Sequence, residues 1–239
     1  MNLAIIPARG GSQRIPRKNI REFAGSPMIH WSISVALMSG IFDKVVVSTD
    51  DEEIAQVAKN SGALVPFMRP AQLADDYTPT RQVVNHAIET CEAKWGRFER
   101  VCCVYATAPL LESSDLVAAY KLLQNTEYNF VFSAVQFEFP IQRAFKLNHQ
   151  SEPEMVQPEN RFTRSQDLEP MYHDAAQFYW GRRDAFISGE YMFAKKSKAY
   201  VLPANQVRDL DTEEDWEIAL ALWQSKKVSK GVIHDSHSL

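Results

Sequence analysis

The chain contains only three cysteines among its 239 residues, an odd count that does not fit a disulfide framework. Cys102 and Cys103 are adjacent within an apolar run, and Cys91 stands alone. We expect buried, reduced thiols, and therefore a cytoplasmic protein, because thiols stay reduced in that compartment.

Long apolar runs are also absent. No stretch approaches the roughly 18 apolar residues that a membrane span needs. The apolar run at the start of the chain, MNLAII, is too short for a secretion signal, and the basic residues follow it instead of preceding it. We therefore expect neither a membrane partner nor export.

Positive charge is not in excess either. The chain has 26 Lys and Arg against 30 Asp and Glu, a formal net charge of -4, which argues against a nucleic-acid partner. The loop motif G-x-x-x-x-G-K-[S/T] and the dinucleotide motif G-x-G-x-x-G are both missing. An anionic ligand must therefore be bound by a local group of cations.

Such a group follows the first apolar run, in the stretch IIPARGGSQRIPRKN at residues 5–19. It holds two adjacent glycines, Gly10 and Gly11, and the cations Arg9, Arg14, Arg17 and Lys18, with Arg21 close behind. Glycines let backbone N–H groups converge on an anion, and basic side chains around them suit a polyphosphate. The alternative is a solvated basic loop without a ligand. Its position directly after a predicted strand favours the ligand.

Apolar runs and helical periodicities alternate along the first 137 residues. Buried strands are predicted at 2–6, 43–50, 64–67, 100–106 and 129–137, and helices at 26–40, 50–62, 78–95 and 113–125. Ser26 is the expected cap of the first helix, with Pro27 at its first position. This order predicts an α/β fold, a three-layer Rossmann-like arrangement with a mostly parallel sheet. Ligands bind at the carboxyl ends of such strands, so loops 7–20, 49–52 and 107–114 are expected to line one site.

The alternation stops at about residue 137. Residues 137–175 contain four prolines and no long periodic segment, which indicates an insertion, a lid or a dimerisation arm. Strands at 175–181 and 198–203 and an amphipathic helix at 212–227, capped by Thr212, complete a domain of residues 1–226. Residues 227–239 are expected to form a tail.

Two polar groups lie in this second part. Asp209 and Asp211 are two apart in an extended stretch, so both carboxylates can face one Mg2+ ion. The equal alternative is that Asp211 and Thr212 only cap the last helix. His173, Asp174 and Gln177 precede or enter a strand, where His173 has a structural role and the other two can bind a polar substrate.

Together these stretches resemble the CMP-sialic acid synthetase family of cytidylyltransferases, whose phosphate loop runs A-R-x-x-S-K-x-x-x-x-K-N. RPAQLADDYTPT at 69–80, YATAPLLESSDL at 105–116 and DLDTEEDW at 209–216 resemble its later motifs, in the same order. The resemblance covers residues 1–225. VCCVYATAP, FPIQRAF, STDDEEIA and TRSQDLEPMYHDAAQFYWG look most like the branch that acts on pseudaminic acid. The sialic acid branch usually carries N-G-A where this chain has Asp174-Ala175-Ala176-Gln177.

The resemblance implies a nucleotide-diphospho-sugar transferase fold that moves CMP from CTP to the anomeric hydroxyl of a nine-carbon acidic sugar, with pyrophosphate as the second product. The implied catalytic residues are Arg9, Arg14, Lys18 and Asp211. The implied nucleotide contacts are Ala8, Arg9, Gly11, Ser12, Asn19, Arg69, Thr80 and Thr107. The implied sugar contacts are Arg164, Asp174, Gln177 and Tyr179.

The resemblance also implies that Asp209 and Asp211 bind Mg2+, with Mn2+ as a substitute, and that the insertion at 137–175 forms a homodimer. N-acetylneuraminic and legionaminic acid are the alternative sugars, and a non-catalytic CTP-binding protein is the distant alternative. Two positions depart from the family: Gln13 stands where a lysine is usual, so we expect Arg14 to replace its charge, and Tyr105 stands where the family has glutamine.

Overall fold

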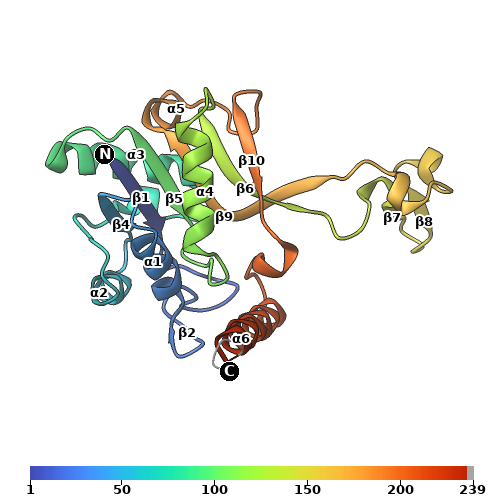
Figure 1. Ribbon diagram of the computed structural model, residues 1–239, viewed down its shortest axis with the longest axis horizontal. Coiled ribbons are helices and arrows are strands. Elements are labelled where there is room, and N and C mark those ends of the chain that lie inside the picture. The colour runs from blue at the N-terminus through green and yellow to red at the C-terminus, as the bar shows by residue number, and fades with distance from the viewer. Residues whose placement is uncertain (236–239) are drawn as a thin grey trace.

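A single six-stranded sheet, in the order β10-β6-β9-β5-β1-β4, forms the centre of the computed structural model (Figure 1). The structure describes the backbone of residues 1–235 and the side chains of residues 1–228. The strands are β1 (Asn2–Pro7), β4 (Lys44–Ser48), β5 (Arg100–Val104), β6 (Phe130–Gln136), β9 (Tyr172–Arg182) and β10 (Ser197–Val201). β9 alone runs antiparallel to its neighbours β5 and β6. The predicted mostly parallel α/β sheet is confirmed.

Helices cover both faces of this sheet. α1 (Met28–Met38), α2 (Glu52–Asn60) and α4 (Ser113–Gln124) pack on the face that Ala4 and Ile6 share. α3 (Thr80–Trp95) and α5 (Arg183–Ser188) pack on the face of Leu3 and Ile5. Successive residues of a strand point to opposite faces, so an apolar run such as NLAII is what a strand buried on both sides requires. The predicted three layers are therefore confirmed.

The last helix lies apart from the sheet. α6 (Glu213–Asp235) runs beyond the predicted end at 227, and positions 236–239 lie outside the described residues. Trp216 and Ala219 of α6 pack against Ile15 and Phe23 of the N-terminal segment, which includes the short antiparallel pair β2 (Glu22–Phe23) and β3 (Ser26–Pro27). This packing joins the two ends of the chain around a third, smaller core.

Two local predictions were wrong. The run at 64–67 forms only one bridge, between Val46 and Leu64, because Pro66 has no N–H to continue a ladder. Ser26 does not cap α1, since it pairs with Phe23 in the β2–β3 ribbon and Pro27 takes the cap position. Short 3-10 turns occur at Ala71–Leu73, Ile141–Arg143, Pro158–Asn160, Ser165–Asp167 and Ala204–Gln206.

The segment between β6 and β9 leaves the body of the protein and projects as an arm (Figure 1). Its tip carries a small antiparallel hairpin, β7 (Phe145–Leu147) with β8 (Pro153–Met155). Several large apolar side chains of the arm are exposed: Phe139, Phe145, Leu147, Val156 and Phe162.

Across the described part of the chain, no helix is both long and apolar enough to cross a membrane.

Candidate active site

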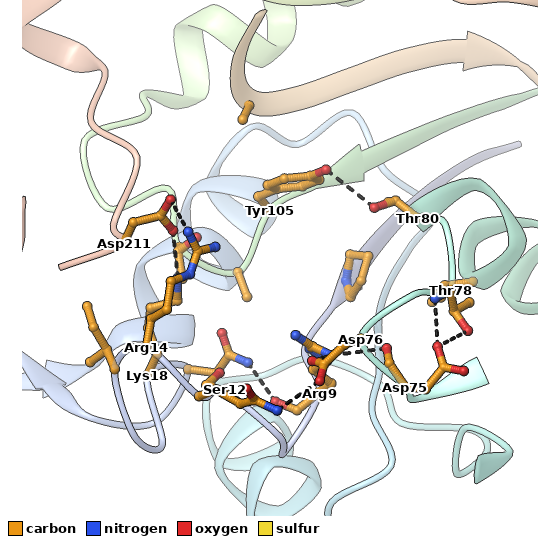
Figure 2. Close-up of a pocket in the computed structure, with 18 of the residues that line it drawn as sticks. Arg9, Ser12, Arg14, Lys18, Asp75, Asp76, Thr78, Thr80, Tyr105 and Asp211 are labelled. Atoms are coloured by element: carbon orange, nitrogen blue, oxygen red, sulfur yellow. Dashed lines mark hydrogen bonds and ion pairs between the residues drawn. The ribbon is translucent and has the colours of Figure 1, made fainter. Parts of the chain in front are cut away.

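A cavity of about 410 Å³ opens at the carboxyl ends of β1 and β5 (Figure 2). Segments distant in sequence line it: residues 7–19, residues 69–83, residues 105–107 after β5, and the carboxylates that precede α6. Two of the three loops predicted to share a site therefore meet here. Loop 49–52 does not line the cavity; its Asp50 instead accepts a hydrogen bond from the N–H of Gly10 at 3.0 Å.

The cations of the basic loop point in different directions. Arg9, Arg14 and Lys18 line the cavity. Arg17 turns outward to α2, where it lies 2.5 Å from Asp51, and this pairing lowers the pKa of the Asp51 carboxyl. Arg21 binds Glu213 of α6 at 2.7 Å. Only part of the positive charge of the loop is therefore available to a ligand in the cavity.

The carboxylates of Asp209 and Asp211 line the same cavity, opposite these cations. Arg14 donates to Asp211 at 2.5 Å, and the Lys18 ammonium lies 3.9 Å from Asp211 and 2.5 Å from the carbonyl oxygen of Leu210. Burial, and then the neighbouring charge of Asp211, raise the pKa of Asp209. Burial lowers the pKa of Lys18, because its charged ammonium group is poorly solvated there. Two carboxylates two residues apart therefore face the cavity, and Asp211 is paired with Arg14 in this structure.

Within the described residues, no group of three or more His, Cys, Asp or Glu side chains could hold a metal ion. Asp209 and Asp211 nevertheless fit Mg2+, because this ion is usually bound by one or two carboxylates, with water and substrate phosphates completing its shell. A metal at this pair would therefore depend on the bound nucleotide.

Neither Gly10 nor Gly11 has a positive φ, so the backbone conformation of the loop does not itself require glycine at these positions. A Cβ at Gly10 would lie 2.7 Å from an oxygen of Asp51, so close approach excludes a side chain there. Gly11 faces open space and does not line the cavity. Ala8 is buried behind the loop, where its N–H donates to the carbonyl of Ser48 at 3.0 Å.

Gln13, which stands where the family usually has a lysine, lines the cavity. Its side-chain amide donates to Asp76 at 2.8 Å. The same carboxylate pairs with Arg9, as Figure 2 shows. Arg9 also donates to the carbonyl of Asp75 at 3.0 Å. Asp76 thus joins the basic loop to segment 69–80, a contact that sequence reasoning did not foresee because the two stretches are far apart in the chain.

Buried polar side chains form the inner wall. Arg69 donates to the hydroxyl of Ser48 at 3.1 Å, and burial lowers its pKa. Asn19 donates to the carbonyl of Arg9 at 3.0 Å and so holds the basic loop in shape. Ser12, Thr80 and Thr107 also line the cavity.

A second cavity of about 230 Å³ adjoins the first, and Thr80 and Tyr105 line both. The hydroxyls of these two residues are 3.4 Å apart. Tyr179 donates to Asp174 at 2.6 Å on the far wall. The remaining wall is largely apolar, and it includes side chains that no sequence pattern marked: Val84, Phe186, Tyr191, Met192 and Phe193.

The candidate sugar residues do not all reach this second cavity. Asp174 and Tyr179 line it, whereas Gln177 is buried and donates to the carbonyl of Ala175 at 2.8 Å. Arg164 lies in the projecting arm and pairs with Asp167 at 2.7 Å. His173, with a ring nitrogen 2.9 Å from the carbonyl oxygen of Asp174, lines neither cavity.

A bulge in β9 sets the direction of Asp174. The register changes from Phe132–Tyr179 to Ala134–Asp174, so extra residues of β9 stand opposite the buried Ser133. The Ser133 hydroxyl accepts hydrogen bonds from the N–H groups of Gln177 and Phe178, both at 3.1 Å. Bulges of this kind redirect side chains beside binding sites. The sequence did not reveal it.

Comparison with known proteins identifies the family that this chain matches. Residues 3–227 match the family described as Cytidylyltransferase. A pseudaminic acid cytidylyltransferase of Campylobacter jejuni is 48% identical over 223 residues, which are 93% of this chain and 96% of that protein. An N-acylneuraminate cytidylyltransferase of Escherichia coli is 28% identical, over 95% of this chain and 53% of that protein. Among solved structures, a CMP:2-keto-3-deoxy-manno-octonic acid synthetase complexed with CTP has a similar fold, with a TM-score of 0.69, 16% identity, and coverage of 94% and 99% of the two chains.

Proposed function

Because the chain belongs to the cytidylyltransferase family, we propose that it transfers CMP from CTP to the anomeric hydroxyl of pseudaminic acid and releases pyrophosphate. The observation that carries the proposal is the first cavity, where Arg9, Arg14 and Lys18 lie opposite a pair of carboxylates. This is a polyphosphate site beside a cation site. The 48% identity to a pseudaminic acid enzyme over nearly both chains supports the choice of sugar.

The reaction needs positive charge where negative charge develops. The sugar oxygen bonds to the α-phosphorus while the bond from phosphorus to the pyrophosphate oxygen breaks, so charge builds up on the phosphate oxygens and on the leaving group. Arg9, Arg14 and Lys18 would bind those oxygens, with Ser12, Asn19, Arg69, Thr80 and Thr107 around the nucleotide. Arg14 would exchange its present partner, Asp211, for a phosphate oxygen.

Mg2+, with Mn2+ as a substitute, would be held by Asp209 and Asp211 together with the triphosphate. When bound, it would stabilise the developing charge and lower the pKa of an attacking hydroxyl. Both carboxylates line the cavity, and the neighbouring charge of Asp211 contributes, after burial, to the raised pKa of Asp209.

The second cavity would hold the sugar. It adjoins the nucleotide cavity at Thr80 and Tyr105, and its apolar wall suits the acyl and methyl groups of a pseudaminate-type sugar. Asp174 and the Tyr179 hydroxyl would bind polar groups of the ring. The carboxylate of the sugar needs a cation. Arg81 lines this cavity, whereas Arg164 lines neither cavity of its own subunit.

A homodimer would allow Arg164 of one subunit to reach the sugar cavity of the other. The projecting arm carries both Arg164 and the exposed side chains Phe139, Phe145 and Phe162, an apolar surface that a second copy could cover. Sedimentation equilibrium of the full chain should give twice the mass of 27.2 kDa, and a single-subunit mass would contradict the shared site.

We also propose that the protein is located in the cytoplasm. Its three cysteines are buried and form no disulfide, which supports this location.

Pyrophosphate release tests the proposed reaction directly. With CTP, Mg2+ and pseudaminate, we expect a turnover number of about 10 per second, the median for enzymes. With N-acetylneuraminate in place of pseudaminate, we expect kcat/KM to be at least about tenfold lower, because its substituents match the second cavity less well. Equal or better use of N-acetylneuraminate or legionaminate would correct the sugar, and no pyrophosphate with any sugar would leave only a CTP-binding protein.

A further inference from the structure

The segment that carries the two candidate metal ligands has no regular structure of its own. Residues 207–211 form neither strand nor helix, and α6 begins just beyond them at Glu213. Leu210 is fully buried against Ile15 and Trp216, so Asp209 and Asp211 project on the opposite side. A carboxylate pair on an irregular segment is useful to a metal only if other contacts fix its backbone.

One side chain makes those contacts on both sides of the pair. An oxygen of Asp215 accepts from the N–H of Asp211 at 3.2 Å and from the N–H and hydroxyl of Thr212 at 2.9 and 2.8 Å. The other oxygen accepts from two nitrogens of Arg208, at 3.0 and 2.6 Å. A single carboxylate therefore joins residue 208 to residues 211 and 212. Of the two candidate ligands, Asp209 lies between its attachment points and Asp211 is one of them.

Helix capping explains only part of this arrangement. The N–H of Asp215 donates to the Thr212 hydroxyl at 3.2 Å, so Thr212 and Asp215 form a capping box at the start of α6. A capping box does not require Arg208 or the N–H of Asp211. Asp215 also does not line the nucleotide cavity, so it is not placed to touch a ligand itself.

We propose that Asp215 is the positioning residue of the metal site: it fixes Asp209 and Asp211 as a ligand pair through its hydrogen bonds to Arg208, Asp211 and Thr212. The proposal rests on the proposed function for the identity of the ion. Residues that orient metal ligands typically change metal affinity or activity by about 10- to 100-fold when they are replaced.

Mn2+ binding measured by electron paramagnetic resonance tests the proposal without turnover. With CTP present, we expect Asp215→Asn to weaken Mn2+ binding by about 10- to 100-fold. Its CTP affinity without metal should stay within about threefold of the wild type, because Asp215 does not line the cavity. Glu214→Gln is the matched control, since it removes an exposed acid from the same helical turn, and it should bind Mn2+ like the wild type.

Thr212→Ala separates positioning from capping. It removes the cap hydroxyl and leaves the contacts of Asp215 with Arg208 and Asp211, so it should lower the stability by about 1 kcal/mol but keep the Mn2+ affinity. If Thr212→Ala weakens Mn2+ binding as much as Asp215→Asn does, or if Asp215→Asn binds Mn2+ like the wild type, the proposal is wrong.

A second variant keeps the test decisive if Asp215→Asn does not fold. Arg208→Ala removes one attachment point and leaves the capping box, and we expect a weakening of Mn2+ binding of about threefold or more; an unchanged affinity would overturn the proposal. Failure of the metal assignment itself is distinguishable, because the wild type with CTP would then bind Mn2+ no more tightly than CTP alone does. Failure of the sugar assignment leaves all these measurements unaffected.

Discussion

Replacing Asp211 with asparagine should lower kcat about a thousandfold, a loss of about 4 kcal/mol of transition-state stabilisation. The loss should persist at saturating Mg2+, since an ion held by Asp209 alone would lack the protein ligand that fixes its position relative to the triphosphate. Steady-state kinetics with pyrophosphate detection, at several Mg2+ concentrations, measures it.

The same variant should leave CTP affinity intact or slightly improved when no metal is present. Arg14 and Lys18 both lie beside Asp211 in the free protein, and losing that charge leaves them more available to phosphate. Glu214→Gln, an exposed acid of the first turn of α6, serves as the control with unchanged kcat. Full turnover by Asp211→Asn at saturating Mg2+ would show that Asp211 is not a metal ligand.

Replacing Lys18 with methionine should lower kcat/KM for CTP about 100- to 1000-fold. Among the three cavity cations of the basic loop, the Lys18 ammonium is the most buried by side-chain exposure, 17% against 34% for Arg9 and 69% for Arg14, so its charge is least screened by water. Excess Mg2+ should not restore the activity, because the lost charge belongs to the protein. Isothermal titration with CTP, with and without Mg2+, gives the binding part of the loss.

The neighbouring residue provides the matched control for this experiment. Arg17 belongs to the same loop and also carries a positive charge, but it pairs with Asp51 and Glu53 and does not line the cavity. Arg17→Met should therefore keep CTP affinity and lower the free energy of unfolding by up to about 1 kcal/mol, since the pair is partly exposed. Equal losses of CTP affinity in both variants would mean that the loop acts through its total charge and not through Lys18.

Much of the architecture could be predicted because it depends on local patterns. Continuous apolar runs such as those of β1, β4 and β5 mark strands buried on both faces, and Asp51 followed by two acids marks the start of α2. The error at Ser26 arose where a neighbouring segment decided the outcome, since Ser26 pairs with Phe23. At residues 64–67 the cause was local: Pro66 has no N–H to extend the single bridge between Leu64 and Val46.

The candidate site also has one part that the sequence predicted and another that only the folded structure shows. The resemblance of the motifs to a known family pointed to a cytidylyltransferase, and the two-residue spacing of Asp209 and Asp211 pointed to a carboxylate pair. The contacts of Gln13 with Asp76, the apolar wall at Met192 and Phe193, and the anchoring of segment 208–212 by Asp215 had no signal in the sequence. Each joins segments or side chains whose proximity depends on the folded backbone.

The basic loop shows the division most clearly. The sequence by itself determined that an acidic chain concentrates Arg9, Arg14, Arg17, Lys18 and Arg21 after its first strand, because composition and order are local properties. Only the tertiary structure decided that Arg9, Arg14 and Lys18 line the cavity while Arg17 binds Asp51 and Arg21 binds Glu213. The physical reason is that α2 and α6 bring carboxylates to the outer side of the loop, and each charge pairs with what lies nearest in space.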